Sequence, residues 1–225
     1  MIELERDGAV FVVRMRNGEN RFNQTSLDEL SGALDQVEAS EGDAALVITG
    51  EGKFFSNGLD LAWLAGQQQD AIERTLDGVH GLLARVLVFP MVTVAAINGH
   101  AFAAGAMFAL AHDFRVMRSD RGYVCLPEVD LGMKQPLSPG MTALLQARLT
   151  PSTLAEALVT GRRYNAAEAV ARGLVHEAIA EDEVLPSAID IARGLANKNR
   201  ETVGAIKRGL YESAVRVLEK PYRLG

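Results

Sequence analysis

The chain has 225 residues, 48% of them hydrophobic and 23% charged, and a formal net charge of −6 at pH 7. This composition is that of an ordinary globular protein with one large domain, and the acidic balance argues against a nucleic-acid or anionic-membrane partner. The single cysteine, Cys125, excludes an internal disulfide and a thiolate metal site, and it fits a reducing compartment.

Neither end of the chain nor its most apolar stretch predicts a targeting or membrane segment. Residues 1–7 are acidic and lack the apolar core of a signal peptide. Residues 92–111 are as long as a membrane span, but the Asn-Gly-His sequence at 98–100 interrupts them, so a buried strand, turn and helix is the better prediction. Residues 221–225 lack a Ser-Lys-Leu peroxisomal signal, and we expect a cytoplasmic location.

The first third of the chain predicts two strands, a helix and a third strand. The strands at residues 2–6 and 10–15 flank an Asp-Gly turn, which is a hairpin signal. After a loop, Ser26 is the expected N-cap of a helix, and Glu29 completes a capping box. A buried strand is then expected at residues 44–49. The buried face of the helix is predicted from its spacing to carry Leu27, Leu30, Leu34 and Val37.

The central part of the chain predicts further alternation of strands and helices. A short strand at Phe54-Phe55 runs into a Ser-Asn-Gly turn. A helix over residues 71–88 is stopped by Pro90, and a buried strand follows at 92–97. The buried face of this helix is predicted to carry Ile72, Leu76, Val79, Leu83 and Val86.

The last part of the chain is predicted to be helical. Short strands at 114–117 and 123–126 and a Pro- and Gly-containing loop at 136–140 precede it. Helices are then expected at 141–149, at 151–160 with Thr150 as cap, at 183–198 and at 202–220. A further helix is expected to begin at the Asn165–Glu168 capping box and to end at Gly173. The first ~130 residues therefore alternate α and β structure, and the last ~85 are helical.

Two glycine-containing turns are candidates for an anion-binding role. Asn57-Gly58-Leu59 and Ala103-Ala104-Gly105 can each present a backbone N–H to one point. Two such donors make an oxyanion hole for a carbonyl that gains negative charge. The spacing alone also fits two tight turns that glycine permits for close packing.

Glu128 is a candidate general base. It follows Pro127, and we expect an extended backbone there. Apolar neighbours would desolvate the carboxylate and raise its pKa toward a useful range. A surface carboxylate after a strand is the alternative. The apolar neighbours in the sequence are Val124, Leu126, Val129 and Leu131.

Other polar residues predict structural roles. His100 and His112 lack an Asp, Glu or Cys cluster for a metal, so we expect a packed turn residue and a helix C-terminal imidazolium, respectively. Ser56 has no Gly-x-Ser-x-Gly elbow and is no nucleophile. We expect Asp60 to cap or brace its turn and Trp63 to line the core or an acyl pocket.

Three segments resemble the enoyl-CoA hydratase/isomerase (crotonase) superfamily. Residues 55–61, Phe-Ser-Asn-Gly-Leu-Asp-Leu, are similar to its Phe-Ser-Ala-Gly-x-Asp-Leu element. Residues 97–105, leading to Asp-Phe-Arg at 113–115, resemble its second element, and Pro-Glu-Val-Asp-Leu-Gly-Met at 127–133 resembles its third. Three ordered motifs at family spacing are far more specific than any one of them, and the resemblance covers nearly the whole chain.

The resemblance implies a fold and an assembly. The fold class is α/β, a crotonase-like spiral of ββα units that carries the active site at residues 1–140. A helical trimerisation region at 141–225 completes this single unit. The resemblance also implies a homotrimer or a dimer of trimers, with an acyl-CoA as its small-molecule substrate. No nucleic acid, membrane or metal partner is expected, and no cofactor apart from the coenzyme A of the substrate.

The resemblance also assigns the site. The family stabilises a thioester enolate with two backbone N–H groups, which here belong to Leu59 and Ala104, and Glu128 matches its general base. Alanine at 104, where many relatives have glycine, leaves this chemistry intact because the donor is main-chain. Substrate contacts are expected from Phe22, Asn57, Gly58, Asp60, Trp63, Phe102, Gly105, Met107 and Met133.

Met107 distinguishes the subfamilies. Hydratases of this superfamily use two glutamates, one at the position of Met107 and one at that of Glu128. Adding water needs a second group to orient it, whereas moving a double bond from position 3 to position 2 needs one base. The chain therefore looks most like the Δ3,Δ2-enoyl-CoA isomerases of fatty acid metabolism, in particular the peroxisomal plant-type members.

Other functions remain as alternatives. They are an enoyl-CoA hydratase, another acyl-CoA enzyme of the superfamily such as a thioesterase or decarboxylase, and a non-catalytic acyl-CoA-binding protein. The Clp-type serine proteases of the same clan carry a serine near the turn at 103–105, and none is present.

Overall fold

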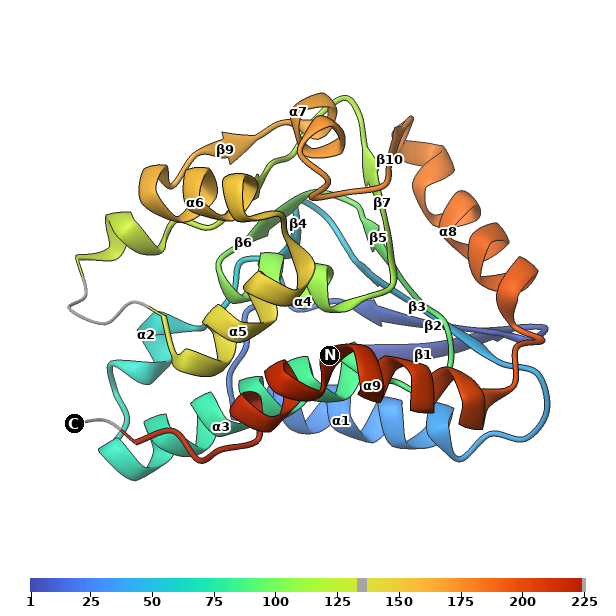
Figure 1. Cartoon of the computed structure of the whole chain (residues 1–225), viewed down its shortest axis with the longest axis horizontal. Helices are drawn as coiled ribbons and strands as arrows, with labels where there is room; N and C mark the ends of the chain where they lie inside the picture. The colour runs from blue at the N-terminus through green and yellow to red at the C-terminus, as the bar shows by residue number, and fades with distance from the viewer. Residues whose placement is uncertain (133–136, 224–225) are drawn as a thin grey trace.

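Two β-sheets surrounded by helices make up the computed structural model, which describes residues 1–132 and 137–223 (Figure 1). In the larger sheet β1 and β2 pair antiparallel and the other neighbours pair parallel. Its spatial order is β1 (Ile2–Asp7), β2 (Val10–Met15), β3 (Ala45–Gly50), β5 (Thr93–Ile97), β7 (Phe114–Arg118) and β10 (Glu177–Ile179). The smaller sheet has the order β4 (Phe54–Ser56), β6 (His100–Phe102), β8 (Val124–Cys125) and β9 (Arg163–Tyr164).

The chain passes from the larger to the smaller sheet in every turn of a spiral. β3 leads into β4, β5 into β6 and β7 into β8, and these strands pair in parallel within each sheet. Helices follow the pairs, which gives the expected repetition of ββα units. The helices of this part are α1 (Gln24–Glu38), α2 (Leu61–Leu64), α3 (Gln69–Leu87), α4 (Ala104–Ala111) and the 3₁₀ helix η1 (Glu128–Leu131).

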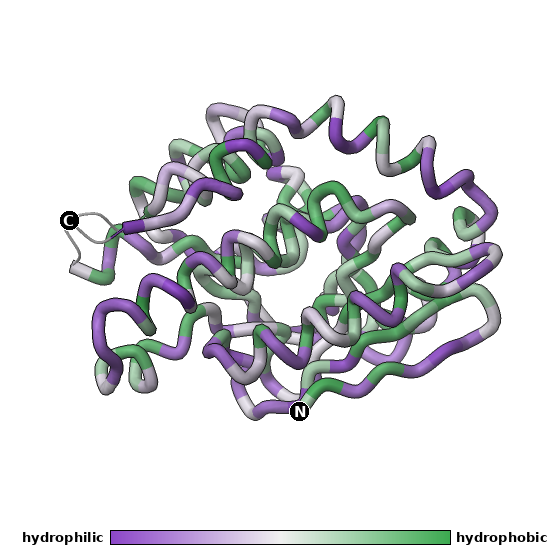
Figure 2. The backbone as a smooth tube through the Cα atoms, turned by 90° about the horizontal axis from the view of Figure 1, so that it is seen from below, coloured by the Kyte–Doolittle hydropathy of each residue, from purple (hydrophilic) through white to green (hydrophobic). Residues whose placement is uncertain are grey.

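The larger sheet separates two hydrophobic clusters because successive side chains of a strand point to opposite faces. On β2, Val10 and Val12 pack with α8 (Glu181–Leu195), whereas Phe11 and Val13 belong to the main core. The main core also contains the buried faces of α1, α3, α4 and α5 (Pro139–Arg148). In Figure 2 hydrophilic and hydrophobic residues alternate along the outer helices, as amphipathic helices require.

The C-terminal region contains two strands as well as helices, so the prediction of an all-helical end was wrong there. β9 and β10 are two and three residues long, which is too short for a strand pattern to show in the sequence. Each forms by pairing with a distant strand, β9 with β8 and β10 with β7. The helices are α5 (Pro139–Arg148), α6 (Pro151–Thr160), α7 (Ala166–Ala171), α8, and α9 (Arg200–Leu218), which packs on α5 and α3.

Helix ends test the predicted caps. Thr150 and the Asn165–Glu168 capping box are confirmed as the N-termini of α6 and α7. The expected cap at Ser26 was wrong, because Asn23, itself a preferred cap, starts α1 one turn earlier and Ser26 occupies the third helical position. The expected loop at 136–140 was wrong for its last residues, since Pro139 is the first residue of α5.

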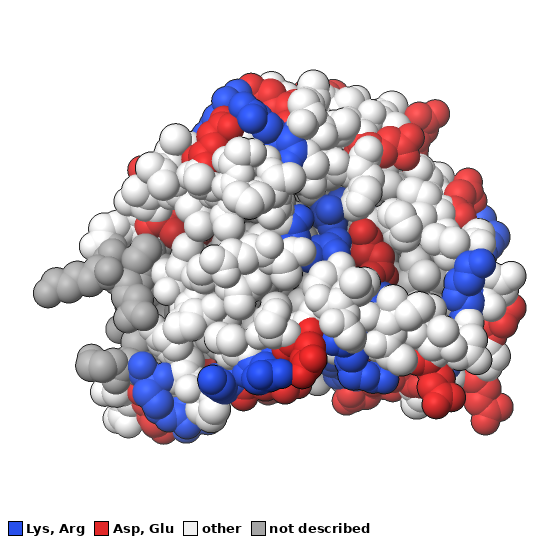
Figure 3. All heavy atoms as spheres, in the orientation of Figure 1, with Lys and Arg blue, Asp and Glu red and all other residues white. Residues whose placement is uncertain are grey.

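Charges of both signs lie close together on the surface. On the face shown in Figure 3 basic and acidic atoms are intermingled and also meet in a hollow at its centre. Some of these opposite charges form exposed ion pairs, such as Arg74–Asp70. Each such pair contributes little to stability because water screens the two charges. Among the helices that the structure describes, none has both the length and the apolar character needed to cross a membrane.

Candidate active site

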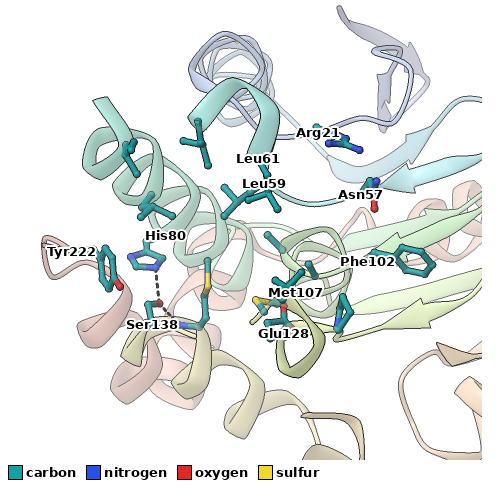
Figure 4. A pocket seen from close by; sticks show the side chains of 18 residues that line it. Arg21, Asn57, Leu59, Leu61, His80, Phe102, Met107, Glu128, Ser138 and Tyr222 are labelled. Atoms are coloured by element: carbon teal, nitrogen blue, oxygen red, sulfur yellow. Dashed lines mark hydrogen bonds between the residues drawn. The ribbon is translucent and has the colours of Figure 1, made fainter. Parts of the chain in front are cut away.

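A cavity of about 290 Å³ lies between α2, α3, α4 and η1 (Figure 4). Much of its wall is aliphatic, with Leu61 and Leu64 from α2 and Ile72 and Leu76 from α3. An apolar cavity with a few polar groups is the usual form of a small-molecule site. The predicted site residues that line it are Asn57, Leu59, Phe102, Ala104, Met107 and Glu128.

Two backbone N–H groups at this cavity have no acceptor among the described residues. Phe22 N–H donates to Gly58 O (2.7 Å) and Asp60 N–H donates to Phe22 O (2.9 Å), so the bridge uses the groups on either side of Leu59. Successive N–H groups of an extended chain point opposite ways, which turns the Leu59 N–H away from this bridge. Ala104 is the first residue of α4, so its N–H has no partner inside the helix.

Glycine brings these two donors together. Gly58 has φ +77°, and a Cβ on it would lie 3.1 Å from Ala104 N. A Cβ on Gly105 would lie only 2.3 Å from the carbonyl oxygen of Ser56, at the end of β4. The two turns are therefore tight and closely packed, which was one of the two interpretations of the sequence. Because of the same packing, the residues that carry the two N–H groups, Leu59 and Ala104, line one cavity.

The residue before α4 has a strained backbone. Ala103 has φ +50° and ψ −127°, a region that glycine occupies much more readily than alanine. Its N–H donates to Cys125 O (3.0 Å) and its carbonyl accepts from Met107 N (3.0 Å), so the surrounding structure holds the conformation. Such strain costs about 1–3 kcal/mol and is typical of functional sites. The bend directs the start of α4 at the cavity.

Glu128 is a buried carboxylate at the same cavity. Its residue is 4% exposed, and its Oε2 has no hydrogen-bond partner among the described residues. Burial raises the pKa of Glu128 from the ordinary 4.5 to about 7, because the charged form loses its hydration. The alternative of a surface carboxylate is therefore wrong.

The local backbone of Glu128 differs from the prediction. It begins the 3₁₀ helix η1 and is not extended, because proline restricts its own φ and the residue before it, not the residue after. The predicted apolar surroundings are correct for Val124 and Leu126, which are buried. Val129 and Leu131 are 48% and 41% exposed, and Leu131 also lines the cavity.

Several predicted substrate-contact residues do not line the cavity. Phe22 is 1% exposed and packs edge-on against Phe108 in the core, with 5.6 Å between ring centres. Asp60 caps α2 as expected, accepting from Trp63 N (3.1 Å), and Trp63 itself lies outside the cavity wall. Gly58 and Gly105 shape the turns instead of contacting the cavity. Met133 lies outside the described residues.

The two histidines of the central segment have structural surroundings. The ring of His100 packs among Phe54, Phe102 and Tyr123. His112 is fully buried, and its Nδ1–H donates to Phe108 O (2.8 Å). Burial lowers the pKa of His112 to about 3, so the predicted imidazolium was wrong and the ring is neutral. No cluster of described residues has the three or more His, Cys, Asp or Glu side chains that would hold a metal ion.

Four polar residues that line the cavity were not predicted as site residues, namely Arg21, His80, Ser138 and Tyr222. The Ser-Pro pair at 138–139 carried a signal, since serine at the N-cap and proline at the first helical position mark a helix start. His80 follows Leu76 by one helical turn, which places it on the cavity face of α3. Arg21 and Tyr222 reach the cavity through loops, for which the sequence gives no periodic signal.

Comparison with known proteins shows which family the chain belongs to. A sequence model described as enoyl-CoA hydratase/isomerase matches residues 5–223. The chain belongs to the enoyl-CoA hydratase/isomerase family. It is 36% identical to enoyl-CoA delta isomerase 3 of Arabidopsis thaliana, over 97% of this chain and 95% of that protein.

Further relatives have both isomerase and hydratase names. Peroxisomal enoyl-CoA delta isomerase 2 of the same plant is 35% identical, over 97% of this chain and 95% of its own length. Among solved structures, an enoyl-CoA hydratase from Mycobacterium marinum superposes with a TM-score of 0.89 at 29% identity, covering 98% of this chain and 95% of that one. The superposition confirms the expected crotonase-type α/β fold.

Proposed function

We propose that this family member is a Δ3,Δ2-enoyl-CoA isomerase. The observation that carries the proposal is that Glu128 is the one carboxylate among the described residues that line the cavity, and that it shares the cavity with two backbone N–H groups that have no acceptor among the described residues. Met107, which is buried at the cavity wall, supplies a thioether where a hydratase would use its second carboxylate. Relatives named enoyl-CoA delta isomerases, at about 35% identity over nearly the whole chain, support the same conclusion.

The proton transfer assigned to Glu128 needs a base that is ionised near neutral pH and strong enough to act there. A pKa raised to about 7 meets both conditions, because efficient general bases have a pKa near the operating pH. Glu128 removes a proton from C2 of the 3-enoyl thioester. The electron pair of that C–H bond forms a dienolate, conjugated with the C3–C4 double bond, whose negative charge is shared by the thioester oxygen, C2 and C4. The same carboxylic acid returns the proton to C4. The product is the 2-enoyl thioester, and the carboxylate is restored.

The backbone donors stabilise the dienolate in this scheme. The Leu59 and Ala104 N–H groups hold the thioester oxygen as it gains negative charge, and they have no competing acceptor among the described residues. Each such donor contributes about 3–4 kcal/mol of transition-state stabilisation. The largely apolar walls lower the local dielectric, which strengthens both hydrogen bonds.

The test is turnover of 3-hexenoyl-CoA by the purified protein, followed by the ultraviolet absorbance of the conjugated 2-enoyl product. We expect the rate to rise with pH through about 7, as Glu128 ionises. Glu128→Gln should lower kcat by about 100- to 10,000-fold, which is the usual contribution of a general base. Glu183→Gln, at an exposed position of α8, is the matched control and should keep full activity.

The alternative functions predict different results in the same assay. Hydration of crotonyl-CoA with no conversion of 3-hexenoyl-CoA would replace the isomerase proposal by a hydratase. Binding of an acyl-CoA without turnover of any 2- or 3-enoyl substrate would indicate a non-catalytic acyl-CoA-binding protein. Isomerisation that survives in Glu128→Gln would show that another group is the base.

We also propose the homotrimer or dimer of trimers that the sequence suggests. Exposed apolar side chains on two C-terminal helices support it, namely Val159 on α6 and Ile206 and Leu210 on α9, which are 74%, 57% and 67% exposed. Light scattering of the purified protein measures the mass directly, and a monomer would contradict the proposal. The cytoplasmic location and the lack of a cofactor beyond the coenzyme A of the substrate stay predictions.

A further inference from the structure

The cavity contains a second group of polar side chains that the proton transfer does not use. His80 of α3, Ser138 before α5 and Tyr222 after α9 line one end, and Figure 4 shows them across the cavity from Asn57 and Phe102. The proposed base lies between the two ends in this view. We call His80 and Ser138 the distal pair.

The distal pair is buried in otherwise aliphatic surroundings. Ile72, Leu76 and His80 follow each other at four-residue spacing on α3, so they form one row, and all three line the cavity. His80 is 2% exposed and Ser138 is 7% exposed. A cavity that held only a hydrocarbon chain would gain from an aliphatic residue at position 80, since burying a polar group is costly unless it is hydrogen-bonded.

The Ser138 hydroxyl oxygen has two protein partners. It accepts a hydrogen bond from Met141 N–H (3.1 Å), because Ser138 is the N-cap of α5. It also lies 2.7 Å from His80 Nε2. His80 Nδ1, by contrast, is buried and has no partner among the described residues.

This arrangement indicates which atom of the pair carries the free proton. Burial lowers the pKa of His80, which favours the neutral ring with one N–H. If the serine donated to Nε2, the ring proton would sit on Nδ1 as a buried donor without an acceptor. If instead Nε2–H donates to Ser138 Oγ, Nδ1 is an acceptor without a donor. That is the less costly arrangement, because buried N–H groups without an acceptor are rarer in proteins than buried acceptors without a donor.

The second arrangement leaves the Ser138 hydroxyl proton without an acceptor among the residues that the structure describes. The oxygen already accepts from Met141 N–H and from His80, so its own O–H takes the remaining tetrahedral direction. We propose that Ser138 donates this hydrogen bond into the cavity, to an uncharged oxygen on the distal part of the acyl chain. The substrate class is thus enoyl-CoAs that carry an oxo or hydroxyl group beyond the reacting double bond. This inference rests on the proposed function, which it makes more specific.

The charges around the distal pair favour a neutral oxygen over a carboxylate. Arg21 is the one cationic side chain among the described residues of the cavity wall, and Figure 4 shows it at the opposite end. Asp77, one turn before His80, interacts electrostatically with the imidazole. Asp77 is itself paired with Arg223 (3.2 Å), and no cationic side chain among the described residues lines this end of the cavity. A substrate carboxylate buried here would therefore lose its hydration without a lining cation to pair with.

The experiment compares substrates within each protein variant. Specificity constants (kcat/KM) are measured for plain 3-decenoyl-CoA and for its derivatives with an oxo group at C6, C7, C8 or C9, and each oxo-to-plain ratio is calculated. For the wild type we expect a ratio of about ten at one of these positions, the effect of one buried hydrogen bond. A ratio at or below one at all four positions would overturn the proposal.

Variants of Ser138 connect the ratio to its hydroxyl. Ser138→Ala should bring the ratio close to one, and Ser138→Thr should restore it. Ser138→Asp still caps α5 and accepts from His80, but its carboxylate cannot donate a hydrogen bond when ionised, so we expect its oxo-to-plain ratio to fall below one. This variant keeps the proposal testable if Ser138→Ala folds poorly. Thr150→Ala removes the cap of α6, away from the cavity, and should leave the ratio unchanged. An unchanged ratio in Ser138→Ala would overturn the proposal.

A binding measurement separates this proposal from the proposed isomerase activity. Saturated decanoyl-CoA and its oxo derivatives cannot be isomerised, and calorimetry gives their Kd without any turnover. Tighter binding of one oxo derivative by about tenfold, lost in Ser138→Ala, would support the distal hydrogen bond even if 3-decenoyl-CoA were not converted. Conversion of 3-decenoyl-CoA with equal binding of all the saturated ligands would support the isomerase and overturn the distal site.

Discussion

Glu128→Gln should stabilise the protein in a way that depends on pH. The folded protein holds the Glu128 pKa at about 7, whereas the unfolded chain has the ordinary 4.5. Below about pH 4.5 the group is protonated in both states and changes nothing. As the pH rises toward 7, the unfolded state ionises first, so the free energy of unfolding falls. Above about 7 the full cost of ionising a buried carboxylate is present.

The size of this effect follows from the two pKa values. A carboxyl group raised from 4.5 to about 7 destabilises the folded state by about 3 kcal/mol once it is ionised, and by about 1 kcal/mol at pH 5.5. Glutamine carries no charge at any pH, so any difference in its packing is the same at both pH values. The stability gained in Glu128→Gln should therefore increase by about 2 kcal/mol between pH 5.5 and pH 8.5.

Equilibrium urea unfolding at the two pH values, at one protein concentration, measures this increase. Glu183→Gln at an exposed site gives the effect of losing one surface carboxylate, which should be small and nearly independent of pH. If the stability difference between Glu128→Gln and wild type were the same at both pH values, the pKa of Glu128 would not be raised. Burial would then give no support to the proposal that Glu128 acts as a base near neutral pH.

Two substitutions test the backbone around α4. Ala103→Gly should raise the free energy of unfolding by about 1 kcal/mol, because glycine relieves the strain at φ +50°; a less stable variant in chemical denaturation would show that the conformation is not strained. Gly105→Ala should lower it by about 2 kcal/mol or more, because the new Cβ would lie 2.3 Å from Ser56 O. Gly81→Ala in α3, where nothing lies within 4 Å of the added carbon, is the control and should be neutral or slightly stabilising in the same assay.

Periodic patterns in the sequence predicted most of the helices and the longer strands. The buried face of α1, with Leu27, Leu30, Leu34 and Val37, is confirmed because helical spacing depends only on local geometry. The α3 face is confirmed for Val79, Leu83 and Val86, whereas Ile72 and Leu76 line the cavity. Strands β6, β9 and β10, of two or three residues, had no such pattern and form through long-range pairing.

The sequence by itself determined the family resemblance and the residue types of the site. Three motifs in order indicated two glycine-containing turns and one glutamate, and Met107 in place of a second glutamate narrowed the proposed reaction. These conclusions needed only residue identity and spacing. They did not require the distance in space between any two of the motifs.

Only the tertiary structure decided which of these groups share a cavity and with what properties. Leu59 and Ala104 meet because β4 and β6 pair in parallel and glycines allow their turns to touch. The raised pKa of Glu128 comes from its burial under distant elements, which local sequence does not report. His80 on α3 and Ser138 at the N-cap of α5, 58 residues apart in the chain, are joined by a side-chain hydrogen bond. Burial and long-range contact are properties of the folded chain, so its sequence pattern alone did not reveal them.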